Sequence, residues 1–99
     1  MESKLMETYK IKKLNNTTDI EKYESLLKEV RANGWKNVPA IVVIENDYGY
    51  YAVTGSHRYA VAEELEIDIP VDLYTEDEIN YILERDDIDE RGIEIIEEI

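Results

Sequence analysis

Four consecutive residues bring together a glycine, a hydroxyl, the only histidine of the chain and a guanidinium: Gly55, Ser56, His57 and Arg58. They follow a β-branched and aromatic segment, residues 50–54, and precede a stretch typical of a helix. A corner between a strand and a helix leaves backbone N–H groups without helical acceptors, and the helix dipole favours negative charge there. A guanidinium fork suits phosphate oxygens. The pattern therefore predicts an anion site, with a nucleotide phosphate as the expected ligand.

His57 and Arg58 are the candidate catalytic residues if the chain also carries out phosphoryl transfer. Arg58 and the N–H groups of the helix start would stabilise the transferring phosphate, and Mg²⁺ would offset its charge. The His57 imidazole would act as the acid or base. Ser56 is interpreted as a helix N-cap rather than as a nucleophile, and no residue stands out as a metal ligand. The structural alternative pairs Arg58 with a carboxylate and leaves His57 as a cap.

The elements that position these residues alternate between strand and helix patterns, which predicts a mixed α+β domain. Trp35 is interpreted either as part of the core or as the wall of a ligand pocket. The expected strands are residues 7–14, with Tyr9 and Ile11 on one face, 40–44, 50–54 and 69–74. The expected helices are residues 19–33, ended by Gly34, residues 56 to about 66, and one that begins with a capping box at residues 75–78. Residues 15–18 are expected to form a turn that ends in an N-cap.

The corner at residues 55–60, followed by Ile69-Pro70-Val71, resembles the ParB/sulfiredoxin superfamily over roughly residues 10–74. The resemblance implies a compact nucleotide-binding α+β domain with a small mixed sheet and packed helices. It implies that Gly55, Ser56, His57 and Arg58 face the phosphates of a nucleotide, for which ATP or CTP, with Mg²⁺ to offset the phosphate charge, is the expected ligand. It also implies that Lys22 and Ser25, on the upstream helix, lie near the nucleoside, and that Lys12 or Lys13 reaches a phosphate.

Departures from the family limit the activities that the resemblance implies. Sulfiredoxins have a catalytic cysteine where this chain has Ser56, and the chain contains no cysteine. Because a serine hydroxyl cannot replace the thiolate, repair of sulfinic acids is excluded. Chromosome-partitioning ParB proteins have an acidic residue where this chain has His57, and they carry a helix-turn-helix module for which 99 residues leave no room. A ParB-like nuclease is a weaker alternative, because no cluster of metal ligands supports it.

Acidic residues are concentrated in the C-terminal part of the chain. The net charge is −13, with +1 on residues 1–58 and −14 on residues 59–99. Direct binding of nucleic acid is therefore not expected. The alternative function is a non-enzymatic regulator or inhibitor, of phage or plasmid origin, whose acidic surface mimics nucleic acid and binds a basic or nucleic-acid-binding protein. Residues 86–99 are interpreted as an acidic extension broken at Gly92, whose isoleucines either pack on the domain or form a dimer or partner contact.

Length and composition limit the number of domains and the location of the protein. Ninety-nine residues, 43% of them hydrophobic and 35% charged, predict one globular domain over residues 1–99. No apolar run approaches the roughly 20 residues that span a bilayer, and residues 1–4 lack the apolar core of a signal peptide. A cytoplasmic location without membrane attachment is therefore expected. These features leave open whether the chain is an enzyme.

Overall fold

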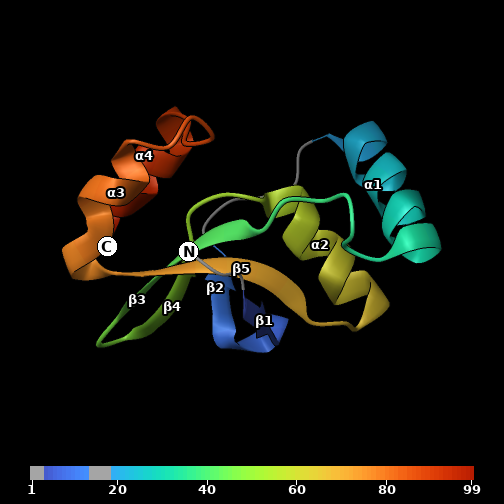
Figure 1. The fold of residues 1–99 in the computed structure, drawn as a ribbon, viewed down its shortest axis with the longest axis horizontal. Coiled ribbons are helices and arrows are strands. Elements are labelled where there is room, and N and C mark those ends of the chain that lie inside the picture. Colours follow the sequence, from blue (N-terminus) through green and yellow to red (C-terminus); the bar gives the residue numbers. More distant parts are fainter. Residues whose placement is uncertain (1–3, 14–18) are drawn as a thin grey trace.

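A five-stranded mixed sheet lies at the centre of the computed structural model, which describes residues 4–13 and 19–99 (Figure 1). The strand order is β1-β5-β3-β4-β2, with β3/β5 and β2/β4 parallel and the other pairs antiparallel. The strands are β1 (Lys4–Met6), β2 (Ile11–Lys13), β3 (Ile41–Asn46), β4 (Gly49–Ala52) and β5 (Ile69–Thr75). Together with the helices, this sheet confirms the predicted α+β class.

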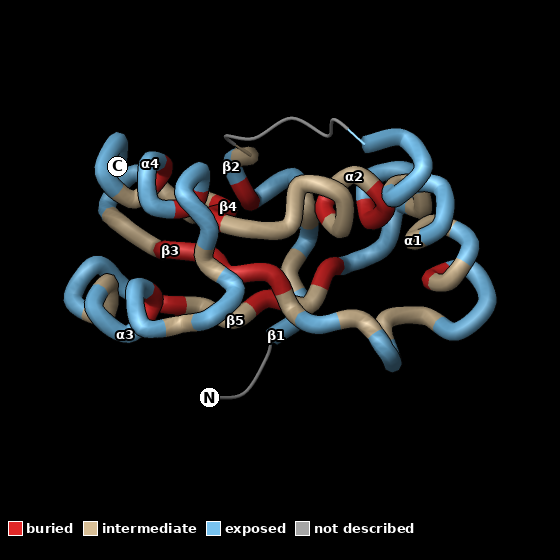
Figure 2. The backbone as a smooth tube through the Cα atoms, turned by 90° about the horizontal axis from the view of Figure 1, so that it is seen from above, coloured by how far each residue is buried: buried red, intermediate tan, exposed pale blue. Residues whose placement is uncertain are grey.

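Helices cover both faces of the sheet, because side chains of the central strand β3 alternate between two hydrophobic clusters. Ile41 and Val43 pack in the cluster that contains Tyr59 and Ala62 of α2, whereas Val42 and Ile44 pack with Ile82 of α3 and Ile95 of α4. Buried positions follow β3 through the middle of the molecule (Figure 2). The helices are α1 (Ile20–Asn33), α2 (Ser56–Leu65), α3 (Ile79–Leu83) and α4 (Glu90–Glu98), with 3₁₀ turns at Thr8–Lys10 and Glu76–Glu78.

Several predicted boundaries are confirmed. The helix expected at residues 19–33 is α1, and Gly34 ends it with φ 65°. Its N-cap is Asp19, whose side chain accepts a hydrogen bond from the Lys22 amide. The turn and cap expected at residues 15–18 lie outside the described residues. The capping box between Thr75 and Glu78 is present, with the Thr75 amide 3.0 Å from the Glu78 carboxylate.

The prediction for residues 7–14 is wrong in part. Within the described residues 7–13, the strand covers Ile11–Lys13, and residue 14 lies outside the described range. Thr8–Lys10 forms a 3₁₀ turn in which Tyr9 is 77% exposed rather than on a shared face with buried Ile11. The reason is topological: β1 and β2 lie at opposite edges of the sheet, so the chain between them must turn and cross. The Tyr59 hydroxyl secures this crossing, because its single proton can be donated to the carbonyl of Thr8, at 2.9 Å, or to that of Ile11, at 3.0 Å.

The expected break at Gly92 is also wrong. Gly92 is buried inside α4, and a Cβ there would lie 3.4 Å from the Val53 carbonyl oxygen, so the glycine lets α4 pack closely on the residue that follows β4. Ile95 is fully buried, which means that at least this isoleucine packs on the domain. No helix in residues 4–13 or 19–99 is long and apolar enough to cross a membrane.

Candidate functional site

A cavity of about 920 Å³ lies where α1, the start of α2 and the segment that leads into α4 meet. Six of the residues that the sequence singled out for ligand binding line it. These lining residues are Gly55, Ser56, His57 and Arg58 at the start of α2, and Lys22 and Ser25 on α1. We call the first four of them the α2 corner.

Gly55 shapes the α2 corner through its backbone. It is the N-cap of α2, with the left-handed torsion angles φ 85° and ψ 38° that favour glycine. A Cβ at this position would also collide with the Ile41 side chain. The interpretation of Ser56 as the N-cap is therefore wrong by one residue: Ser56 is the first helical residue, because the sharp turn needs the glycine at the boundary.

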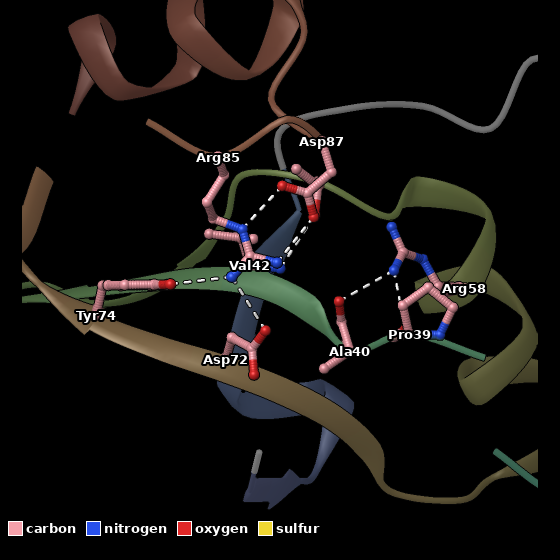
Figure 3. Close-up of polar contacts among 9 residues, drawn as sticks. Pro39, Ala40, Val42, Arg58, Asp72, Tyr74, Arg85 and Asp87 are labelled. Atoms are coloured by element: carbon pink, nitrogen blue, oxygen red, sulfur yellow. Dashed lines mark hydrogen bonds and ion pairs between the residues drawn. The ribbon is translucent and has the colours of Figure 1, made fainter. Parts of the chain in front are cut away.

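Arg58 is anchored to backbone carbonyls. Its Nη1 donates to the carbonyl oxygens of Pro39, at 2.9 Å, and Ala40, at 3.0 Å, in the segment before β3 (Figure 3). Burial lowers the pKa of the Arg58 guanidinium, while the nearby Asp87 carboxylate acts in the opposite direction. An arginine stays charged despite such a shift. The structural alternative of a direct Arg58–carboxylate pair is not observed among the described residues.

His57 and Thr54 connect the α2 corner to its surroundings. His57 Nε2 accepts a hydrogen bond of 3.4 Å from the amide of Asp19, the N-cap of α1, so α1 begins beside the corner. Thr54 also lines the cavity, and its hydroxyl accepts from the Val42 amide at 3.0 Å. The sequence analysis missed Thr54. Its position directly before Gly55 could have indicated that it lies at the same site.

The third wall of the cavity comes from the segment interpreted as an acidic extension. Asp87, Asp89 and Arg91 line the cavity, and we call these three residues the C-terminal wall. Asp89 is the N-cap of α4 and accepts from the Gly92 amide at 2.9 Å. The pattern of an aspartate three residues before Gly92 could have indicated this cap. Its position at the same cavity as the α2 corner depends on the tertiary fold and leaves no local signal.

Arg85 holds the C-terminal wall in place. Its Nε and Nη2 donate to the two Asp87 oxygens, each at 2.8 Å, and its Nη1 donates to Asp72 and to the Tyr74 hydroxyl (Figure 3). The hydrogen bonds from Arg85 lower the pKa of Asp87, and the carboxylate in turn raises the pKa of Arg85. This fork therefore fixes the carboxylate of Asp87 beside the cavity.

Other predicted contacts are not made at this cavity. Lys12 donates to the Tyr48 carbonyl and the Tyr51 hydroxyl, and Lys13 lies over the Tyr59 ring. Neither lysine lines the cavity. Trp35 packs against the cluster under α2 and donates to the Asp68 carbonyl, which supports its interpretation as core. In the described part of the chain, no group of three or more His, Asp or Glu side chains could hold a metal ion.

Comparisons with known proteins identify the fold. No protein-family model matches the chain, and no curated protein matches it. Sulfiredoxin from Arabidopsis thaliana has a similar structure, with a TM-score of 0.66 and 25% identity over 84% of this chain and 98% of that one. Truncated chromosome-partitioning ParB from Caulobacter crescentus, complexed with CTP-gamma-S, has a TM-score of 0.62 and 20% identity over 98% of this chain and 52% of that one.

A conserved hypothetical protein from Pyrococcus furiosus is also similar, with a TM-score of 0.62 and 21% identity over 76% of this chain and 33% of that one. The chain thus has a ParB/sulfiredoxin-like fold, as its sequence predicted. It spans nearly the whole of the sulfiredoxin chain but only about half of the ParB chain.

Proposed function

We propose that this domain binds a nucleoside triphosphate, with the phosphates at the α2 corner and the nucleoside along α1. The observation that carries the proposal is that the helix start, an anchored arginine and the two α1 residues line a single cavity, although they come from distant parts of the sequence. A site of this kind joins a phosphate cradle to a surface for the rest of the nucleotide.

The α2 corner is suited to phosphate for three reasons. The start of α2 provides backbone N–H groups and the positive end of the helix dipole. Gly55 adopts the left-handed backbone conformation that lets α2 begin at the cavity. Among the described residues only Nη1 of Arg58 donates a hydrogen bond, which leaves the rest of an already oriented guanidinium available for phosphate oxygens.

Phosphoryl transfer or slow hydrolysis is the chemistry that this site would support. Arg58 and the helix N–H groups would stabilise charge on the transferring phosphate, and His57 would accept or donate the proton. Asp87 and Asp89 are the carboxylates of the C-terminal wall, but Arg85 and the Gly92 amide already use them. Mg²⁺ would therefore be held mainly by phosphate oxygens and water, as is common for this ion.

The similar structures support the ligand class and not a particular reaction. The ParB chain was solved with CTP-gamma-S, a triphosphate. The similarity to sulfiredoxin does not imply repair of sulfinic acids, because this chain has Ser56 and no cysteine.

Calorimetry with ATP, CTP and ADP in the presence of Mg²⁺ tests the proposal. Loss of charge-assisted hydrogen bonds in Arg58→Ala should weaken triphosphate binding by about tenfold or more. Arg31→Ala is the matched control, because Arg31 is exposed on α1 and does not line the cavity. Because Arg58 also anchors Pro39 and Ala40, thermal unfolding of each variant serves as a second measurement, of stability. Triphosphate binding by Lys22→Ala tests the site at a second residue that lines the cavity. Absence of binding by the wild type to every nucleotide and to inorganic triphosphate would overturn the proposal.

The acidic regulator remains the second candidate, favoured by the outward face of α4. Ile95 is buried, whereas Glu94, Glu97 and Glu98 are exposed. Such a face suits a basic protein surface. Salt-sensitive binding to a basic nucleic-acid-binding protein, together with no response to nucleotides, would favour this function over the first.

A further inference from the structure

Glu29 adds a carboxylate to the cavity that the phosphate proposal does not use. It lies on α1, seven residues after Lys22 and therefore about 10 Å further along the helix axis. The first turn of α1 lies beside His57, so Glu29 lies at the end of α1 that is farther from His57. This spacing suits a nucleotide that extends along α1 from its phosphates to its base.

Two amides orient the Glu29 carboxylate. Asn33 Nδ2 donates to Glu29 Oε2 at 3.2 Å, and Asn37 Nδ2 donates to Oε1 at 3.5 Å. Each carboxylate oxygen has two acceptor positions, so both oxygens can accept one more hydrogen bond. The carboxylate is thus an oriented pair of acceptors.

Apolar side chains lie beside this pair of acceptors. Leu26, Val38 and Pro39 line the cavity together with Glu29 and Asn37. Apolar surface with a few placed polar groups is the usual composition of a site for a flat organic ring. This end of the cavity therefore offers contacts for the faces of a base and acceptors for its edge.

We propose that Glu29 recognises guanine, so that the preferred ligand is a guanine nucleotide. Guanine presents two parallel donors, N1–H and the 2-amino group, which match the two oxygens of a carboxylate that can only accept. Adenine and cytosine present one amino donor beside a ring nitrogen that is an acceptor. That ring nitrogen would face the second oxygen of the Glu29 carboxylate with no proton between the two atoms. The inference rests on the proposed nucleotide site, but it departs from the ATP or CTP that the family resemblance implies.

Four triphosphates separate these bases: GTP, ITP, ATP and CTP. ITP is the analogue of GTP that lacks the 2-amino group on its base, so the ratio of GTP to ITP affinity isolates one of the two hydrogen bonds. In the wild type we expect GTP to bind about tenfold more tightly than ITP, ATP or CTP, as for a hydrogen bond to a charged group. Glu29→Gln replaces one acceptor by a donor, so it should remove the preference for GTP while ATP binding stays the same or improves.

Glu24→Gln is the matched control, because Glu24 is exposed on the same helix and does not line this cavity. It should keep the wild-type order of affinities. If the wild type binds ATP or CTP as tightly as GTP, or if Glu29→Gln keeps the GTP preference, the role of Glu29 is overturned while the nucleotide site stands. If no nucleotide and no inorganic triphosphate bind, the proposed function fails and the base preference fails with it.

Discussion

The α2 corner and the C-terminal wall enclose the same cavity but are held in place by different kinds of interaction. In the α2 corner, Gly55 fixes a backbone turn, and Arg58 donates to main-chain carbonyls. In the C-terminal wall, the fork of Arg85 binds the carboxylate of Asp87, and Asp89 caps α4 with its side chain. Backbone carbonyls do not titrate, whereas carboxylates do.

This difference implies that the two walls respond to different changes. The α2 corner depends on shape, so added volume should disturb it at any pH. The C-terminal wall depends on ionised side chains, so it should weaken in acid and in high salt. The cavity thus combines a wall that is set by the backbone with one that is set by charge.

The largest effect is expected for Gly55→Ala in the α2 corner. The added Cβ would collide with Ile41 and would occupy left-handed backbone space, so we expect a loss of about 2–4 kcal/mol in the free energy of unfolding. Urea denaturation measures this loss. Gly34→Ala is the control, because Gly34 also has a positive φ but no atom lies within 4 Å of its added Cβ. Equal losses in both variants would show that packing against Ile41 does not matter.

A smaller effect is expected for Arg85→Met in the C-terminal wall. The variant loses the fork to Asp87 and the bonds to Asp72 and Tyr74, which should cost about 1–2 kcal/mol at neutral pH. Urea denaturation again measures it, with Arg31→Met as an exposed control on α1.

The pH dependence of the Arg85→Met effect identifies its cause. The hydrogen bonds from Arg85 lower the pKa of Asp87 in the folded state. This contribution is therefore complete above the unfolded pKa and disappears as the pH falls through the folded one, so the difference between wild type and variant should shrink below roughly pH 4. A difference that is constant from pH 7 to pH 3 would mean that packing of the Arg85 side chain, and not its charge pair, holds the wall.

The two walls also differ in how far the sequence predicted them. The α2 corner was predicted because its signals are local: a strand pattern, Gly55, and a helix opened by His57 and Arg58. Only the boundary was misplaced, at Ser56, because the N-cap depends on the close approach of Gly55 to Ile41. The helix α1 and the capping box at Thr75 were predicted for the same reason, since caps and helical spacing are encoded in neighbouring residues.

The C-terminal wall was not predicted because its signals are not local. Residues 86–90, four of which are acidic, look like a solvated segment until Arg85, Asp72 and Tyr74 are brought together by the fold. Gly92 looks like a break in the acidic segment until α4 packs on Val53. Likewise, the 3₁₀ turn at Thr8–Lys10 follows from the order of the strands and not from the alternation of its residues.

The smallest effect is expected for Asp87→Asn, which changes charge in the C-terminal wall and leaves the α2 corner intact. Asp87 lies close enough to Arg58 to influence its pKa, so its negative charge opposes an incoming triphosphate. Repulsion between the Asp87 carboxylate and the phosphates, screened by water and salt, should change the affinity by about two- to fivefold. Calorimetry at low salt should therefore show tighter triphosphate binding by the variant, and the gain should decrease as salt is added.

Asp86→Asn is the matched control for this last change, because Asp86 is an exposed neighbour that does not line the cavity. A gain in Asp87→Asn that Asp86→Asn does not share places the repulsion at the cavity itself. A loss of affinity in Asp87→Asn would reverse the comparison: the carboxylate, fixed by Arg85, would then act as a positioning group for the bound ligand or its cation. In that case the wall that is set by charge would contribute to binding as directly as the corner that is set by the backbone.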